Sequence, residues 1–439
     1  MPDSELPSRP AARSPFARCA KILFLALLLA WLFLVFWNSA KPLPPGTHVL
    51  SQTSRLSESD VELAHGAPDA PAIEHAEQLI VLDRSPVPRE LARRLLARKH
   101  ARPNIKIVLL TDPGNEAFGG TASAILAELE QAGVIVARVR LDRLRDSNPL
   151  YSGLWRLLFE WWNDPFDETP GRPTLPAWAR MQNFKADQRQ LLIADDGSGG
   201  WTAAVAATAA DPGLTVRGSL ARAMIVSELQ IAAWSTDDDR LPAAPPSGGR
   251  GVGSIDARFL TEGAIESALI EAIAAAGGGD QVYIAVENFS DRRLVAAVLQ
   301  AAARGVRLQV LMARNRMPNQ VVAQELERGA GGNIEVRWRT PAQAAAAPKL
   351  LLVRHRNDLW MNWGSANFTR RNLADLNLEA AVELRMPARA AAARAVSDYF
   401  TKAWSSAQAD AQTGAETADH SAAFYWKYRL AEAAGLSGF

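Results

Sequence analysis

Cysteine is nearly absent from this chain, with Cys19 as the single one among 439 residues. An internal disulfide is therefore excluded, and so is a zinc site built from cysteines, because each needs at least two thiol groups. Charge of one sign is not in excess either, since 48 lysines and arginines face 47 aspartates and glutamates. Because nucleic-acid binding usually goes with a basic surplus, no nucleic acid is expected as a partner.

Short catalytic signatures are missing too. The sequence contains no His-Glu-x-x-His zinc motif, no Gly-x-Ser-x-Gly nucleophile elbow and no Gly-x-Gly-x-x-Gly dinucleotide fingerprint. None of the six histidines has a lysine two positions later; they are His48, His65, His75, His100, His355 and His420. No cofactor and no metal are therefore expected.

An unbroken apolar run over residues 22–37 is a prominent feature of the sequence. As a helix it would be about 24 Å long, slightly short of the roughly 30 Å hydrocarbon core of a bilayer, and Cys19 and Ala20 extend it. Four basic residues precede the run, namely Arg9, Arg13, Arg18 and Lys21. A basic flank on this side predicts a cytoplasmic N-terminus, with the bulk of the chain in the periplasm or outside the cell.

We interpret this segment as an uncleaved, single-pass anchor in the inner, cytoplasmic membrane. A cleaved signal peptide is the alternative. The apolar run is longer than that of a usual signal peptide, and the small-residue site nearby, residues 38–40, has an asparagine at its outer position. Both points favour the anchor, through which the membrane becomes the first expected partner.

Composition and pattern divide the chain into successive segments. They are a cytoplasmic tail (residues 1–18), a transmembrane anchor (19–40), a linker (41–75), a first half (76–235), a linker rich in proline and glycine (236–253), a second half (254–405) and a C-terminal extension (406–439). Within each half, short apolar runs typical of buried strands alternate with amphipathic helical patterns. The order of the elements in the second half repeats that in the first, which predicts a duplicated α/β fold.

The stretch KLLLVRHRNDLWMNWGSANFTRRNLADLNLEAAVEL, residues 349–384, resembles the second half of proteins of the phospholipase D superfamily. Four further segments resemble a bacterial, membrane-anchored group of that superfamily, namely residues 144–158, 183–201, 290–306 and 431–439. The resemblance covers most of residues 76–439. It implies two mixed or parallel sheets flanked by helices, preceded by one N-terminal transmembrane helix.

The resemblance also implies a site where the halves meet. Each half of a superfamily member carries the motif His-x-Lys-x4-Asp. One histidine attacks the phosphorus and the other protonates the leaving oxygen, while the lysines neutralise developing charge on the phosphoryl oxygens. That chemistry needs no metal.

Most of these motif side chains are replaced in this chain. The first half has Gln188, Gln190 and Asp195 at the histidine, lysine and aspartate positions. The second half has Ala347, Lys349 and Arg354 at the same three positions. Alanine cannot attack phosphorus, and a glutamine amide does not titrate as an imidazole does near neutral pH. Both catalytic histidines are therefore missing, and no residue is assigned a catalytic role.

The supporting side of a phosphate site is retained. The resemblance implies that Lys349, Ser365 and Asn367 bind phosphate. Equally, Ser365 and Asn367 could cap a helix over residues 368–374, because serine and asparagine are preferred at helix N-termini. Arg370 and Arg371 could reach a lipid headgroup, but ordinary surface charges are the favoured interpretation.

Three functions are consistent with these observations. The favoured one is a membrane-anchored, catalytically impaired protein with a residual site for phosphate, an anionic phospholipid or another phosphodiester between its halves. The second is an active phosphodiesterase or phosphatidyltransferase, similar to cardiolipin synthase, that uses a replacement residue. The third is a structural envelope protein that binds neither phosphate nor lipid. The sequence identifies neither a lipid headgroup nor a protein partner.

Overall fold

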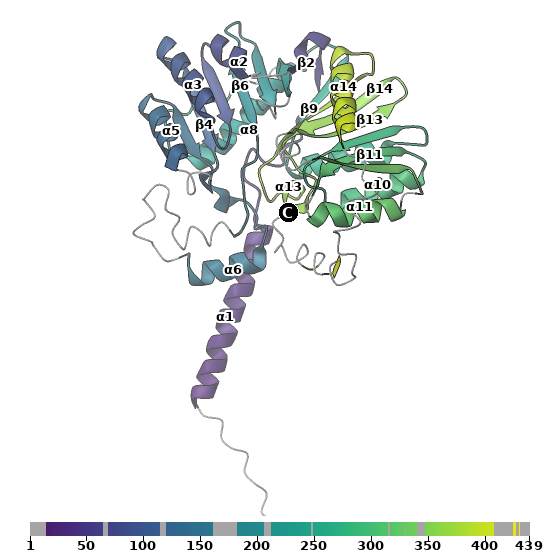
Figure 1. The fold of residues 1–439 in the computed structure, drawn as a ribbon. Helices are drawn as coiled ribbons and strands as arrows, with labels where there is room; N and C mark the ends of the chain where they lie inside the picture. The colour runs from purple at the N-terminus through teal and green to yellow at the C-terminus, as the bar shows by residue number, and fades with distance from the viewer. Residues whose placement is uncertain are drawn as a thin grey trace, which may run out of the picture.

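The computed structural model describes residues 15–64, 69–114, 120–160, 182–205, 212–246, 249–314, 317–329, 331–339, 347–407, 425–426 and 430. One long helix, α1 (Pro15–Ala40), projects from a body made of two α/β halves that lie side by side (Figure 1). Most of the expected C-terminal extension falls outside the described residues, including the stretch 431–439.

The first half is built on a seven-stranded sheet in the order β2-β8-β7-β6-β3-β4-β5. The strands are β2 (Val61–Ala64), β3 (Leu79–Asp83), β4 (Lys106–Thr111), β5 (Ile135–Arg138), β6 (Leu191–Asp195), β7 (Trp201–Val205) and β8 (Gly213–Arg217). The helices are α2 (Asp69–His75), α3 (Arg89–Ala101), α5 (Gly120–Gln131), α6 (Pro149–Leu158) and α8 (Ser219–Ser235), with short 3-10 turns at Glu58–Asp60 and Leu141–Arg143. Strands β3, β4 and β5 run parallel, and the rest pair antiparallel.

The second half is built on an eight-stranded sheet in the order β1-β9-β15-β14-β13-β10-β11-β12. The strands are β1 (Ser54–Leu56), β9 (Ile255–Thr261), β10 (Gln281–Ala285), β11 (Arg307–Ala313), β12 (Ile334–Arg339), β13 (Lys349–His355), β14 (Asp358–Gly364) and β15 (Ala380–Pro387). The helices are α9 (Gly263–Ala275), α10 (Arg292–Ala303), α11 (Met317–Gly329), α13 (Arg370–Leu373) and α14 (Ala391–Ser406).

The two sheets share one plan. Each has three parallel strands, β3-β4-β5 or β10-β11-β12, joined edge to edge with an antiparallel hairpin, β6-β7 or β13-β14. The prediction of a duplicated α/β fold with two mixed sheets flanked by helices is therefore confirmed. The central strands β3 and β6 are buried along their whole length, which is why they stand out in the sequence as continuous apolar runs.

The segment expected to be a linker, residues 41–75, is more than a connector. It supplies strand β1 to the second sheet, strand β2 to the first sheet, and helix α2. Strands of three and four residues are too short to show a clear alternation of apolar and polar residues. The same chain segment therefore ties the two halves together at their edges.

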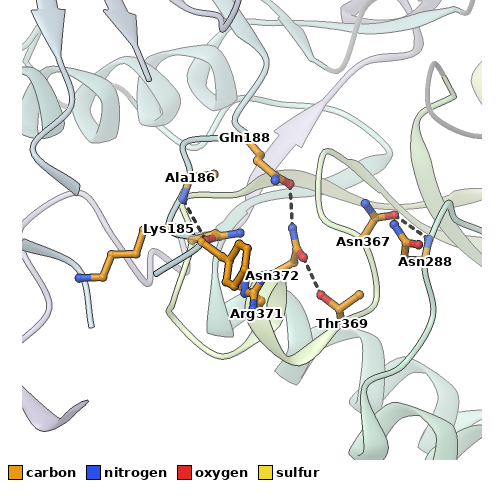
Figure 2. Close-up of a pocket in the computed structure, with 10 residues that line it drawn as sticks. Lys185, Ala186, Gln188, Asn288, Asn367, Thr369, Arg371 and Asn372 are labelled. Atoms are coloured by element: carbon orange, nitrogen blue, oxygen red, sulfur yellow. Dashed lines mark hydrogen bonds between the residues drawn. The ribbon is translucent and has the colours of Figure 1, made fainter. Parts of the chain in front are cut away.

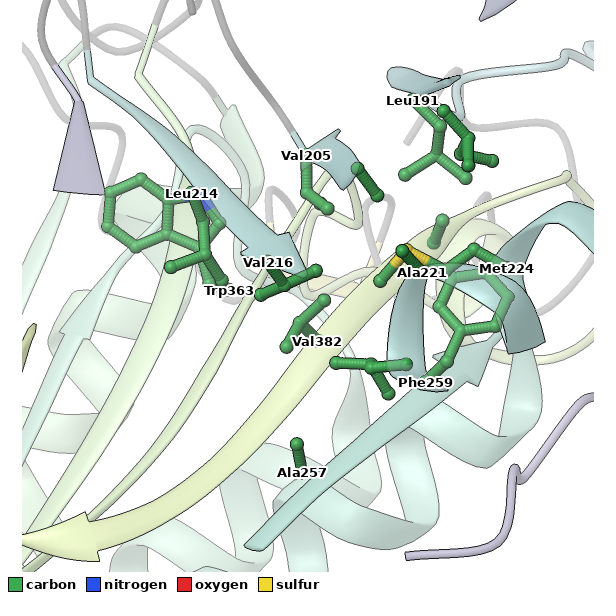
Figure 3. Packing of buried hydrophobic residues seen from close by; sticks show 14 of the residues in the cluster. Leu191, Val205, Leu214, Val216, Ala221, Met224, Ala257, Phe259, Trp363 and Val382 are labelled. Carbon is green, nitrogen blue, oxygen red and sulfur yellow. The ribbon is translucent and has the colours of Figure 1, made fainter. Parts of the chain in front are cut away.

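The two sheets pack against each other across a shared hydrophobic core (Figure 3). Met224 of α8 and Val216 of β8 come from the first half, while Phe259 of β9, Trp363 of β14 and Val382 of β15 come from the second. Because both halves supply side chains to one buried cluster, the halves form one body, and the boundary between them is a fixed structural feature.

Helix α1 meets this body at its C-terminal end. Trp31 Nε1 donates to Leu150 O of α6 at 3.1 Å, and Asp146 N donates to Asn38 O at 3.1 Å. Gly153 lets the helices approach closely, because a Cβ there would lie 2.7 Å from Val35 Cγ2. Residues 18–40 of α1 are long and apolar enough to cross a membrane, and only 6% of the most apolar window is buried. By length and composition the segment is thus a membrane span or a signal sequence.

Candidate functional site

The two halves touch directly at the segment that precedes β6. Gln188 N donates to Leu378 O and Leu378 N donates to Ala186 O, both at 3.0 Å, so this segment lies alongside residue 378 as a parallel bridge. Position 188, to which the resemblance assigns the first motif histidine, therefore stands at the boundary between the halves.

A pocket of about 300 Å³ opens at this boundary (Figure 2). It is lined by Phe184, Lys185, Ala186, Gln188, Asn288, Asn367, Thr369, Arg371, Asn372 and Asn377. Half of these side chains are neutral amides and two are cations. No carboxylate is among the lining residues in the described part of the chain. Such a wall offers hydrogen bonds and positive charge, which suits a phosphate group better than a cation.

The amides of the pocket are held in place by one another (Figure 2). Thr369 Oγ1 donates to Asn372 Oδ1 at 2.6 Å, and Asn372 Nδ2 donates to Gln188 Oε1 at 2.8 Å. Asn372 Nδ2 also donates to Glu379 Oε1. Where an imidazole would stand in the first half, the structure thus has an amide fixed by its neighbour.

Glu379 lies buried behind this network. Its Oε2 accepts a hydrogen bond from Ser365 Oγ, and Ser365 Oγ accepts one from Ala380 N at 3.1 Å. Burial raises the pKa of Glu379 to about 7, although the hydrogen bonds from Ser365 and Asn372 and the charge of Lys349 oppose the rise. The carboxyl group is 0% exposed and both of its oxygens are engaged, so it is not placed to attack a ligand in the pocket.

The second-half motif positions lie at the start of β13. Lys349 Nζ donates to Ala347 O at 3.1 Å, and the charge of Lys349 acts on Glu379. Ala347 is 4% exposed, so its methyl group is buried where an imidazole would stand. Arg354 is exposed five residues further along the strand, opposite Gln281 of β10, or about 17 Å from Lys349.

Two of the first-half motif positions, Asp195 and Gln190, lie in or next to strand β6. Asp195 accepts hydrogen bonds from the backbone N–H groups of residues 77–79 at 3.0, 2.9 and 2.7 Å. It therefore joins β6 to the beginning of β3. Gln190 is half-buried and immediately precedes β6, two residues beyond the exposed Gln188.

Asn367 lines the pocket but does not cap a helix. Its Oδ1 accepts from Glu287 N at 3.1 Å and from Asn288 N at 3.0 Å, in the loop after β10. Helix α13 begins only at Arg370, behind Thr369, and is a single turn. The capping alternative for Ser365 and Asn367 is therefore wrong, because both side chains are directed to other elements.

Arg371 is a pocket residue that the sequence interpretation misplaced. It is 6% exposed, and its Cζ lies 4.7 Å from the centre of the Phe184 ring. Burial, which is the larger effect, and the charge of Arg370 together lower the pKa of Arg371 to about 10. The guanidinium therefore stays charged at neutral pH. The prediction of a surface charge is wrong for this residue, because α13 turns it toward the first half.

Lys185, the other cation of the lining, is paired with a carboxylate of the first half. Its Nζ lies 2.6 Å from Asp146 Oδ1 and donates to Leu144 O at 2.7 Å. Asp146 also pairs with Arg156 of α6. Figure 2 shows Lys185 directed away from the amides. Of the two cations in the described lining, Lys185 is thus the one held away from the amides.

A second buried charge cluster lies beside the site. Arg189, 1% exposed, forms ion pairs of 2.7 Å with Glu228 of α8 and with Glu262 of the second half. Its Nη2 also donates to Gly46 O at 2.9 Å. Burial would lower the pKa of Arg189, but Glu262 and Glu228 raise it above the ordinary value. The sequence offered no sign of this contact, because Arg189 occupies the unspecified position of the motif.

Two carboxyl groups complete this cluster. Burial raises the pKa of Asp83 well above its ordinary value, and the charges of Asp187 and Glu228 add to the rise. Burial likewise raises the pKa of Asp187 well above the ordinary value, although the charge of Arg189 opposes it. The one guanidinium thus stands among more carboxyl groups than it can neutralise, which agrees with the raised pKa values of Asp83 and Asp187.

Comparison with known proteins agrees with this geometry. Residues 269–404 match the family model described as cardiolipin synthase, PLD-like domain. No curated protein sequence matches the chain. Among solved structures, phosphatidylserine synthase from Haemophilus influenzae Rd KW20 is similar over 94% of this chain and 99% of that one, with a TM-score of 0.55 and 10% identity. Nuc from Salmonella typhimurium, a phospholipase D family member, matches 36% of this chain and 99% of its own, with a TM-score of 0.29 and 17% identity.

Fold and site together define a duplicated α/β protein with a polar pocket where its halves meet. Residues 269–404 match a phospholipase D-like family model, and nearly the whole chain shares its fold with the phosphatidylserine synthase structure.

Proposed function

We propose that this chain is a membrane-anchored member of the superfamily that binds a phosphate-bearing ligand, an anionic phospholipid or a related phosphodiester, without cleaving it. The observation that carries the proposal is the pocket between the halves, where a buried Arg371 stands among neutral amides. A charged guanidinium and amide N–H groups are donors that suit phosphate oxygens.

The surroundings of the motif positions support the loss of catalysis. Phosphohistidine chemistry needs a nucleophile and a proton donor that titrate near neutral pH. Gln188 is an amide held by Asn372, and Ala347 is a buried methyl group. Glu379 titrates in the right range, but its two oxygens are bound by Ser365 and Asn372.

The proposed phosphate contacts differ in part from those implied by the resemblance. Asn367 lines the pocket together with Arg371 and is proposed to bind directly. Lys349 is proposed to act from a greater distance, through its charge. Ser365 is proposed to support Glu379 and, through it, Asn372.

The contacts of α1 support an anchor that is retained. Trp31 and Asn38 are bonded to Leu150 and Asp146 of the body, contacts that cleavage of a signal sequence would remove. We propose a single span in the inner membrane, with the N-terminus in the cytoplasm because of its basic flank and the body on the far side.

Replacing Arg371 by glutamine is expected to weaken ligand binding about 10- to 100-fold, the equivalent of a lost charge-assisted hydrogen bond of roughly 1.5–3 kcal/mol. The measurement is titration of the purified full chain in detergent with short-chain phosphatidylglycerol, alongside assays for release of the headgroup. The matched control is Arg89→Gln, which removes the same charge from an exposed position at the start of α3.

Saturable binding without headgroup release, weakened only by the Arg371 change, supports the proposal. Turnover that is lost in the same variant would instead identify an active phosphodiesterase or phosphatidyltransferase. No binding at all would favour a structural envelope protein. Equal affinities for the wild type and both variants would mean that the lipid binds away from the pocket, which contradicts the proposal.

A further inference from the structure

Helix α6 exposes a row of leucines. Leu150, Leu154 and Leu158 are 44%, 47% and 45% exposed. Their spacing of four residues places all three on one side of the helix. The opposite side, which faces the protein, carries the buried Trp155 together with the polar Ser152 and Arg156. A helix in water normally keeps its leucines on the protein side and its charged side chains outward.

The polar groups of α6 explain how it is held in this orientation. Arg156 pairs with Asp146, and the two side chains are only 7% and 0% exposed. Ser152 Oγ donates to Asp146 Oδ2 at 2.5 Å and accepts from Asn183 Nδ2 at 2.9 Å. Because these bonds direct the polar face inward, the leucines have to face outward.

The outward face of α6 continues the apolar surface of α1. The helices cross where Gly153 approaches Val35 and Trp31, and Figure 1 shows α6 lying across α1 at the base of the body. Beside this crossing, Phe33 and Phe36 of α1 are 62% and 69% exposed. The leucines thus extend a surface that, on the proposed function, is already in lipid.

The depth of the crossing fits a helix at the membrane surface. If Arg18 stands at one edge of the hydrocarbon core, Trp31 lies about 20 Å and Val35 about 26 Å from that edge, measured along α1. The core is roughly 30 Å thick, so α6 meets α1 some 5–10 Å below the far edge. That is the depth to which interfacial amphipathic helices are buried.

We propose that α6 lies in the membrane interface, with Leu150, Leu154 and Leu158 inserted into the leaflet from which α1 emerges. This inference rests on the retained anchor of the proposed function, but it holds for either orientation of α1. It also places the pocket close to lipid headgroups. Lys185 of the pocket lining pairs with Asp146, and Arg370 Nη2 donates to Ser147 O at 3.0 Å, two residues before α6.

The test places one fluorescent label at a time on the full chain in lipid nanodiscs, in a Cys19→Ser background that removes the single native thiol. Leu154→Cys reports on α6, and Lys402→Cys, exposed on α14 away from α1 (Figure 1), is the matched control. Phe33→Cys reports on the anchor. Quenching by spin-labelled lipids is compared with quenching by iodide in the water.

We expect the label at position 154 to be quenched several-fold more by the lipid quencher than by iodide, as at position 33, and the label at 402 to show the opposite preference. If position 33 is quenched by lipid while position 154 is quenched by iodide, α6 is exposed to water. The inference about α6 then fails, while the proposed anchor stands. Protection of position 154 from both quenchers would mean that protein covers the leucines, which also overturns it. If lipid fails to quench position 33, the anchor itself is refuted.

Discussion

Replacing Arg189 by methionine is expected to lower the free energy of unfolding by about 3–5 kcal/mol, the usual cost of removing one partner from a buried ion pair. The change leaves Glu228 and Glu262 without their shared guanidinium, at a place where the chain after the anchor, the first half and the second half all meet. The measurement is unfolding of the purified full chain in detergent, followed by tryptophan fluorescence.

The matched control for this change is Arg217→Met, which breaks an exposed pair with Glu62 whose side chains are 41% and 57% exposed. Exposed pairs contribute about 0–1 kcal/mol, so the control is expected to be nearly neutral. Arg189→Lys keeps the charge but loses the planar fork, and should fall between the two. Equal, small losses for Arg189→Met and Arg217→Met would contradict the role assigned to Arg189.

Replacing Glu379 by glutamine is expected to remove part of the pH dependence of stability. The pKa of Glu379 is raised in the fold from 4.5 to about 7, so its contribution is fully present below pH 4.5 and is lost as the pH rises to about 7. At about 1.4 kcal/mol per pKa unit, the loss is about 3 kcal/mol. The stability of the variant relative to wild type should therefore increase by about that amount between pH 4.5 and 7.5.

Thermal unfolding of both proteins across this pH range checks the prediction. Other buried carboxyl groups with raised pKa values, Asp83 and Asp187 among them, impose a slope of the same sign on both proteins, so only the difference between the two profiles is informative. The exposed Glu90→Gln variant is the control and should follow the wild type. Parallel profiles for wild type and Glu379→Gln would show that this carboxyl is ionised throughout.

Strands and helices with a strong local pattern could be predicted from the sequence. Strand β3 and the hairpin β13-β14 appear as apolar runs bounded by turn residues, because the centre of a sheet is buried on both faces. Strands β8, β9 and β15 were not expected. Each pairs on at least one side with a strand distant in sequence, and pairing of that kind leaves little mark on the local pattern.

The candidate site could be predicted as a place but not as a set of contacts. Of the positions singled out through the resemblance, Gln188 and Asn367 are among the residues that line the pocket, whereas Ala347, Lys349 and Ser365 are not. Arg371 and Asn372 were not identified. Two adjacent arginines look alike in a sequence, and only the direction of the single turn α13 makes one of them buried.

Composition and periodicity were thus sufficient for the duplicated α/β architecture and the apolar N-terminal helix, because each of these is written in consecutive residues. Only the tertiary structure established the amide network around Gln188, the buried Arg189 and the outward leucines of α6. Those features depend on which side chains meet across long separations in the chain. They also depend on burial, which affects charge and hydrogen bonding and exists only once the chain has folded.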